Sequence, residues 1–192
     1  MAARLKQPCL LLLKVRMGNK RVVQLIFAFV VVINLSACAT NINYVDIHKD
    51  KLIEQKAVEN MACQYRLVAV NDKRQDGDKA GLMGLNEFSF SAPEDVVSSQ
   101  LIKLGMLNAE SLVGRDVVVD IKYIYIKTGP SSKIPTVVYD VRVGEQDQFI
   151  IRGQAVTIIW VGNEKEAYKS FNAAFQSANS QLIIELNKRC PK

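Results

Sequence analysis

The stretch Val117-Val118-Val119-Asp120-Ile121-Lys122-Tyr123-Ile124-Tyr125 determines the fold class that we expect for this chain. One set of alternate positions is apolar and aromatic: Val117, Val119, Ile121, Tyr123 and Tyr125. The other set includes Asp120 and Lys122. A period of two is typical of a β-strand with one buried face and one partly solvated face. The sequence therefore predicts a strand that begins near Arg115.

Two further strands are expected directly after this one. Gly129-Pro130 marks a turn, Ile134–Val143 returns as a second strand, and Gly144–Asp147 turns the chain into Phe149–Val161. Short connections of this kind join neighbouring antiparallel strands, so the pattern predicts a three-stranded antiparallel meander. Gly153, inside the last strand, indicates a bulge or bend.

A long helix is expected at the C-terminal end of the sequence. Asn163 can cap its first turn, with Glu166 three residues later, which is the spacing of a capping box. Apolar residues then recur at threes and fours on one face, as an amphipathic helix requires: Ala167, Phe171, Ala174, Phe175, Ala178, Leu182 and Leu186. We expect this face to lie across the meander and to cover Tyr123, Tyr125 and Trp160.

A shorter helix is predicted earlier in the chain. Ser91 as cap, Pro93 in the first turn and Glu94 three residues after the cap are helix-start signals. Val97, Leu101 and Leu104 share a face, and Gly105 is a stop.

Strands at Gln64–Val70 and Leu85–Ser91 precede this helix, joined by the loop Asn71–Gly84. Together these elements predict an α+β fold with two layers, in which two helices pack on one face of a mostly antiparallel sheet, the β-meander. The loop is longer than a simple connection needs, which is typical of either a functional surface or a flexible segment.

The N-terminal region has the layout of a signal peptide. Lys20 and Arg21 precede the apolar run Val22–Ile33, and Leu35-Ser36-Ala37-Cys38 follows it. An uncleaved transmembrane anchor typically needs ~20 apolar residues, more than this run supplies. A core helix is disfavoured because the run has no polar face.

Leu35–Cys38 resembles the lipobox of bacterial lipoproteins. The resemblance implies cleavage between Ala37 and Cys38 and a lipid on the Cys38 thiol. Residues 1–37 would then be the signal peptide, with Met17 as a natural start, and residues 38–62 the lipidated N-terminus and a tether. Residues 63–192 would form a single periplasmic α+β domain, a size that can bury its own core.

Cleavage at this position changes the charge balance. The chain has 25 Lys and Arg against 19 Asp and Glu. Six of the basic residues and none of the acidic ones precede Cys38, so 19 of each remain: Arg4, Lys6, Lys14, Arg16, Lys20 and Arg21 are lost. A balanced domain gives no electrostatic argument for nucleic-acid binding.

Cys63 and Cys190 bracket the expected domain. Lipoproteins mature outside the cytoplasm, where thiols become oxidised, so the two cysteines predict a disulfide, with unlinked thiols as the alternative.

The usual parts of an active site are missing from the sequence of the domain. His48 is the only histidine, so no Ser-His or Cys-His pair is expected, and no metal or cofactor either. Asp72, Asp76 and Asp78 do not have the spacing of a calcium loop. The carboxylates Asp120, Asp140 and Glu145 remain as weak enzymatic candidates, and we expect a protein that is not an enzyme.

The order of elements is similar to that of the YajG family of uncharacterised envelope lipoproteins and, more distantly, to auxiliary lipoproteins of lipid-transport systems such as PqiC. Ala39 after the lipidated cysteine implies sorting to the outer membrane, with inner-membrane anchoring as the alternative. The expected function is a non-enzymatic binding or scaffold subunit of an envelope complex, facing the periplasm.

The alternative function is a carrier with an apolar ligand between sheet and long helix. Phe171, Phe175 and Trp160 would then line the cavity. Otherwise no small-molecule ligand is expected.

Overall fold

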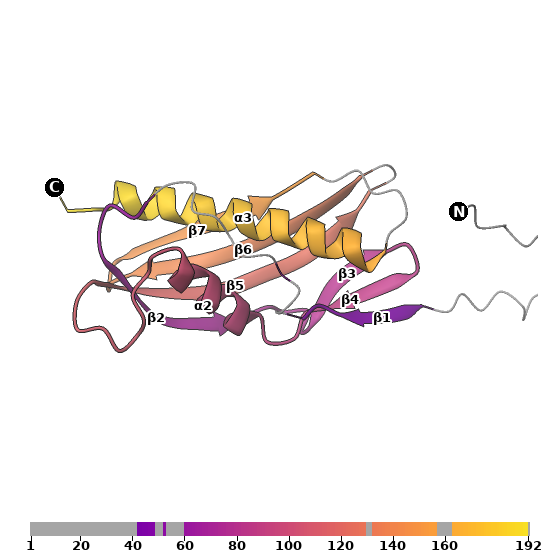
Figure 1. Cartoon of the computed structure of the whole chain (residues 1–192), viewed down its shortest axis with the longest axis horizontal. Helices are drawn as coiled ribbons and strands as arrows, with labels where there is room; N and C mark the ends of the chain where they lie inside the picture. Colours follow the sequence, from indigo (N-terminus) through magenta and orange to yellow (C-terminus); the bar gives the residue numbers. More distant parts are fainter. Residues whose placement is uncertain (1–41, 49–51, 53–59, 130–131, 157–162, 192) are drawn as a thin grey trace, which may run out of the picture. The chain divides into compact units, whose positions relative to one another are not determined.

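The fold has two layers, in which helices pack on a single β-sheet (Figure 1). The structure is a computed structural model and describes residues 42–48, 52, 60–129, 132–156 and 163–191. The expected signal peptide, including Met17 and the run Val22–Ile33, lies outside these residues. The described residues belong to one unit, Asn41–Lys192.

The sheet has strands β1 (Asn43–Asp46), β2 (Tyr65–Asp72), β3 (Lys79–Met83), β4 (Asn86–Ser89), β5 (Arg115–Thr128), β6 (Lys133–Val143) and β7 (Asp147–Gln154). Their order is β1-β4-β3-β5-β6-β7, and β2 also pairs with β5. The meander β5-β6-β7 is antiparallel, as expected, and so is β3-β4. The pairings of β1 with β4 and of β2 and β3 with β5 are parallel. The α+β expectation is confirmed, with a mixed sheet.

The two helices that the structure describes cover the same face of the sheet. The long helix α3 (Glu164–Lys188) runs along β6 and β7, and the short helix α2 (Pro93–Lys103) packs on β2 (Figure 1). The capping box of α3 is present as expected, because the Asn163 side chain accepts from the Glu166 amide and the Glu166 carboxylate accepts from the Asn163 amide. No helix among the described residues is long and apolar enough to cross a bilayer.

The core lies between the helices and the sheet. Three phenylalanines fill its centre: the Phe90 ring centroid lies 5.9 Å from that of Phe171 and 5.7 Å from that of Phe175. A buried polar chain joins the layers, in which the Tyr139 hydroxyl donates to Asn179 and the Asn179 amide donates to Gln100 on α2. Burial raises the pKa of Tyr139 far above its ordinary value, so this hydroxyl stays a donor.

The start of α2 differs from the prediction. Its N-cap is Ala92, with φ 47° and no side-chain cap, rather than Ser91. The amide and hydroxyl of Ser91 instead donate to the Asp46 carboxylate on β1. Pro93 does occupy the first turn, and the helix ends at Lys103 before Gly105 as predicted.

The folded unit also starts earlier than the expected boundary at Cys63. Asn43–Asp46, placed in the tether by the sequence, forms β1 and pairs with β4, and Ile47 is buried in the core. The paired residues of β1 and β4 are far apart in the sequence. The local sequence around Asn43 therefore does not predict this strand.

Gly153 does not mark a bulge, since β6 and β7 pair without a register shift. A Cβ at this position would lie 2.3 Å from the Ala178 backbone nitrogen and 2.4 Å from the Ala174 carbonyl oxygen. The glycine therefore allows α3 to approach β7 closely.

Candidate functional site

A β-bulge in β5 turns two tyrosines to the open face of the sheet. The pairing of β5 with β6 shifts register between Ile121 and Tyr123. Val117, Val119 and Ile121 before the shift are buried, and after it Ile124 and Ile126 are buried instead. The extra residue of a bulge reverses the alternation beyond it.

The prediction that the long helix covers Tyr123 and Tyr125 is therefore wrong for both residues. Trp160, the third residue of that prediction, lies outside the described residues. The two tyrosines lie on the face opposite α3, with ring centroids 5.6 Å apart and ring planes inclined by 34°.

These tyrosines form one wall of a groove, which we call the tyrosine groove. It encloses about 690 Å³ and is lined by Gln75, Asp76, Lys79, Tyr123, Tyr125 and Lys127. The first three come from the loop after β2 and the start of β3, and the others come from β5. The groove thus offers aromatic faces, an amide, two ammonium groups and one carboxylate. These are the polar and aromatic groups that mark binding surfaces.

The hydroxyl of Tyr123 stays protonated at neutral pH. Its pKa is raised from the ordinary value, first by burial against the groove, and then by the nearby Tyr125 and Asp76. Arg152, on β7, acts in the opposite direction. A neutral phenol beside two lysines can donate to the oxygen atoms of a bound partner.

Close contact between β3 and β5 shapes this groove. Gly81 has φ 113°, and a Cβ there would lie 2.6 Å from the Ile126 carbonyl oxygen. A residue with a side chain would push β3 away from β5, and Lys79 would move with it.

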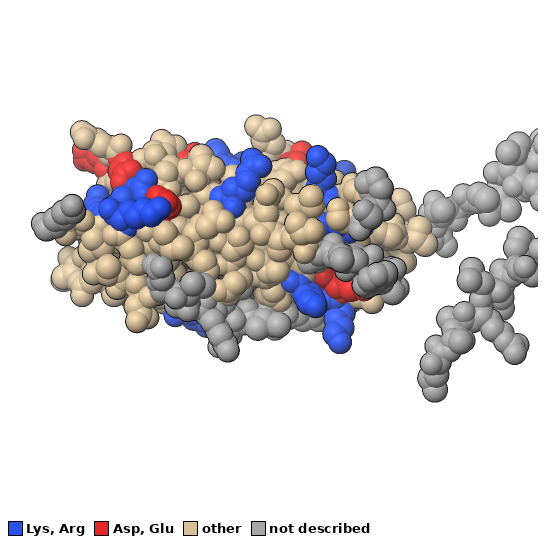
Figure 2. All heavy atoms as spheres, turned by 90° about the horizontal axis from the view of Figure 1, so that it is seen from above, with Lys and Arg blue, Asp and Glu red and all other residues tan. Residues whose placement is uncertain are grey.

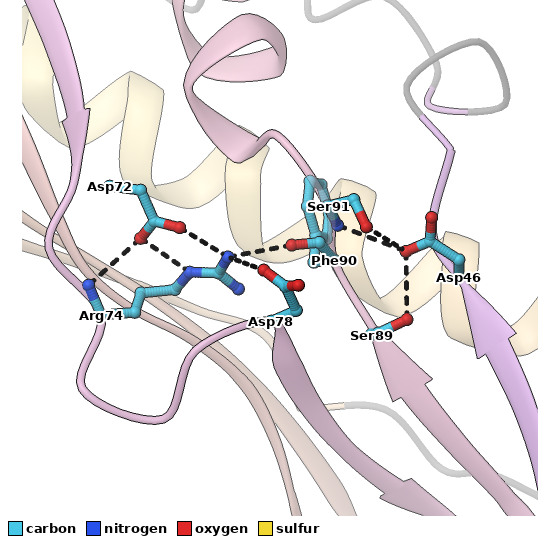
Figure 3. A network of polar contacts seen from close by, with 7 residues as sticks. All are labelled: Asp46, Asp72, Arg74, Asp78, Ser89, Phe90 and Ser91. Atoms are coloured by element: carbon cyan, nitrogen blue, oxygen red, sulfur yellow. Dashed lines mark hydrogen bonds and ion pairs between the residues drawn. The ribbon is translucent and has the colours of Figure 1, made fainter.

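The loop that carries Gln75 and Asp76 is anchored by Arg74 (Figure 3). The guanidinium binds Asp72 through two hydrogen bonds of 2.9 and 2.7 Å, and donates to the Phe90 carbonyl oxygen at 2.9 Å. Asp78 lies 3.7 Å from the same group. The Arg74 side chain is 3% exposed, and its bonds with Asp72 lower the pKa of that carboxyl.

The expected loop Asn71–Gly84 is consequently more structured than the sequence indicated. Its second half forms β3, and Arg74 ties its first half to the ends of β2 and β4. Asp72 and Asp78 serve this ion pair, and no group of three metal-binding side chains occurs in the part of the chain that the structure describes.

A second network links the ends of β1 and β4. The Asp46 carboxylate accepts from the Ser89 hydroxyl and from the amide and hydroxyl of Ser91 (Figure 3). These bonds hold the edge strand to the sheet beside the Arg74 cluster.

The structure brings two of the enzymatic candidates together, but both carboxylates already have hydrogen-bond and ion-pair partners. Asp120 and Asp140 face one another on β5 and β6. Asn71 donates to Asp120 and Gln148 donates to Asp140, each at 2.7 Å. Lys122 and Arg142 form ion pairs with them, so each carboxylate has polar partners on the sheet surface. Glu145 lies apart, in the turn between β6 and β7.

The carrier interpretation depended on Phe171, Phe175 and Trp160. The two phenylalanines are fully buried and contact Phe90, as in an ordinary core. Their arrangement gives no support to a ligand between sheet and helix.

The disulfide prediction is confirmed. Cys63 and Cys190 are bonded, with Cα atoms 5.8 Å apart and a sequence separation of 127. The bond joins the segment before β2 to the end of α3. Hydrogen bonds between Asn187 and the backbone of Asn60 and Ala62 support the same junction. Ala37 and Cys38 lie outside the described residues.

On the face drawn in Figure 2, basic and acidic groups are interspersed among uncharged residues, with no extended area of one sign.

Comparison with known proteins finds structures of similar fold but assigns the chain to no family. No family model matches the sequence, and no curated protein matches it. The fold is similar to that of protein XCC0632 from Xanthomonas campestris, described under the family name DUF330, with a TM-score of 0.52 and 10% identity. That match covers 77% of this chain and 97% of XCC0632.

Two other solved structures are more distant. An uncharacterised protein matches at a TM-score of 0.44 and 10% identity, covering 69% of this chain and 99% of its own. The PelC dodecamer from Paraburkholderia phytofirmans matches at 0.35 and 10% identity, covering 67% and 93%. Likeness at these two TM-scores carries no argument about function.

Proposed function

We propose that this chain is a lipid-anchored, periplasm-facing envelope lipoprotein that acts as a non-enzymatic binding or accessory subunit of an envelope complex. The observation that carries the proposal is the Leu35–Cys38 motif after its basic and apolar segments. It assigns Cys38 as the lipid-bearing residue and Ala39 as the sorting residue for the outer membrane.

The disulfide supports the location. Bonds between cysteines persist in oxidising compartments and are rare in the cytosol. Cys63 and Cys190 close almost the whole domain, so export would be needed to complete the fold.

The tyrosine groove supports the binding role. One face of the sheet is covered by helices, and the groove lies on the other, where Tyr123 and Tyr125 are accessible to a partner. Its walls come from β5, from the start of β3 and from the loop that Arg74 anchors, and a preformed surface lowers the entropy cost of binding.

The anchor is tested by metabolic labelling with palmitate. The wild type is expected to incorporate label, and Cys38→Ala is expected to lose it entirely. Equal labelling of both proteins would contradict the proposed anchor.

The binding role is tested by photo-crosslinking in cells. A photoreactive residue at Lys127, in the groove, is expected to give discrete adducts with an envelope protein. A matched control at Leu112, which is 96% exposed and lies in the loop before β5, is expected to give none. Identical adduct patterns at both positions, or none at Lys127, would contradict the groove as the binding surface.

A further inference from the structure

One end of the sheet carries four exposed apolar side chains, which we call the tip patch. Its members are Ile42 (43% exposed), Tyr44 (79%), Leu82 (44%) and Leu85 (54%). Ile42 directly precedes β1, Tyr44 lies in β1, Leu82 lies in β3, and Leu85 lies in the turn between β3 and β4.

Strand pairing brings these residues together. Tyr44 and Leu82 both pair with Glu87, from the two sides of β4. The Asn43 amide donates to the Leu85 carbonyl oxygen at 2.8 Å, so Ile42 and Leu85 are neighbours at the end of the strands. β1, β3 and β4 lie together at one end of the sheet in Figure 1.

The patch lies where the chain arrives from the anchor. Only three residues lie between Cys38 and Ile42, which limits the separation of their Cα atoms to about 15 Å. The sequence predicted a tether up to residue 62. The folded unit lies closer to Cys38 in the chain than predicted because β1 joins the sheet.

The side chains of the patch suit a lipid surface. Leucine and isoleucine enter the boundary between headgroups and acyl chains, and tyrosine places an apolar ring there with its hydroxyl in water.

We propose that the tip patch contacts the leaflet that holds the lipid on Cys38, so that the domain stands on the membrane through β1 and the β3-β4 turn. This inference rests on the proposed lipid anchor.

The experiment uses quenching of tryptophan fluorescence by brominated phospholipids. The full acylated protein is reconstituted in vesicles of phosphatidylethanolamine and phosphatidylglycerol, with Trp160→Phe in every variant. The probe is Leu85→Trp in the patch. The control is Leu112→Trp, which precedes β5, whereas the patch lies near the last residues of that strand. The two positions are therefore about 35 Å apart along β5.

Quenching of the Leu85→Trp probe is expected to be at least about two-fold stronger than that of the control, because side chains at the interface reach about 5–10 Å into the boundary. Reduced hydrogen exchange of residues 83–86 on vesicles is a second readout that needs no substitution. Protein that pellets with the vesicles, but shows equal weak quenching at both positions and unchanged exchange, overturns the tip contact and leaves the anchor intact. Such a result would also follow from a second copy covering the patch. Protein that does not pellet and carries no lipid overturns the proposed anchor, and the inference with it.

Discussion

The close approach of α3 to Gly153 makes a substitution there a direct test of the packing. In Gly153→Ala, the new Cβ would meet the Ala178 nitrogen at 2.3 Å, the Ala174 oxygen at 2.4 Å and the Ala178 Cβ at 2.5 Å. Two of these atoms belong to the helix backbone, so no side-chain rotation relieves the contact. The helix or the strand must move.

Two effects of opposite sign decide the magnitude. Replacing glycine by alanine at a compatible position stabilises a protein by about 0.4–1 kcal/mol, through the unfolded chain. Overpacking a core costs about 1–3 kcal/mol, and contact with backbone belongs at or above the upper end. We expect a net loss of about 2 kcal/mol, which lowers the melting temperature of a domain of this size by about 4–8 °C.

The assay is thermal and urea unfolding with the disulfide intact. Gly144→Ala is the matched control, because its φ of 63° strains alanine while nothing lies within 4 Å of the new Cβ. Its expected cost is the backbone strain alone, about 1–2 kcal/mol.

A second variant separates backbone from side-chain contact. Adding Ala178→Gly to Gly153→Ala is expected to restore little stability, because the closest contacts remain. An unchanged or raised melting temperature for Gly153→Ala would refute the packing described for α3 and β7.

Three further predictions concern the covalent and polar links of the domain. Replacing Cys63 and Cys190 by alanine is expected to lower the free energy of unfolding by up to about 5 kcal/mol, since the bond closes a loop spanning 127 residues; an unchanged urea midpoint would count against this link. The lowered pKa of Asp72 contributes stability above its unfolded pKa of about 3.9, and this is lost as the pH falls through the folded pKa. Urea midpoints between pH 2 and 5 are therefore expected to fall more steeply for the wild type than for Asp72→Asn, and parallel curves would exclude the Arg74 pairing as the cause. Tyr139→Phe is expected to cost about 1–3 kcal/mol in chemical unfolding, because a buried Asn179 oxygen loses its donor, and a neutral effect would mean that this bond is not formed.

Local patterns were sufficient for the elements that depend on local interactions. Asn163 and Glu166 identified the start of α3, and the alternation after Arg115 identified the meander. Capping and amphipathic periodicity act within a few residues, so they can be read without knowledge of the fold.

The tyrosine groove could not be predicted, because the bulge that creates it depends on pairing. The alternation Val117 to Tyr125 is unbroken in the sequence, but β6 imposes a register shift before Tyr123. Two aromatic side chains that looked buried became the accessible wall of the groove. A local signal was the presence of Ile124 and Ile126 in the same alternate set as Asp120 and Lys122.

Long-range contacts also explain the missed start of the domain. The sequence around Asn43–Asp46 is polar, as in a linker. Asp46 nevertheless accepts hydrogen bonds from Ser89 on β4 and from Ser91 just after it. These bonds hold β1 on the sheet. They also engage Ser91, which the sequence predicted as the cap of α2. Both corrections have one physical origin, the parallel pairing of β1 with β4.

The central claim, that this domain is held to a membrane through Cys38, is tested most directly by mass spectrometry of the mature N-terminus. The account predicts that the N-terminal peptide of protein isolated from the envelope begins at Cys38 and carries acyl chains. An N-terminal peptide that retains residues before Cys38, or an unmodified Cys38 in envelope-derived protein, would contradict it.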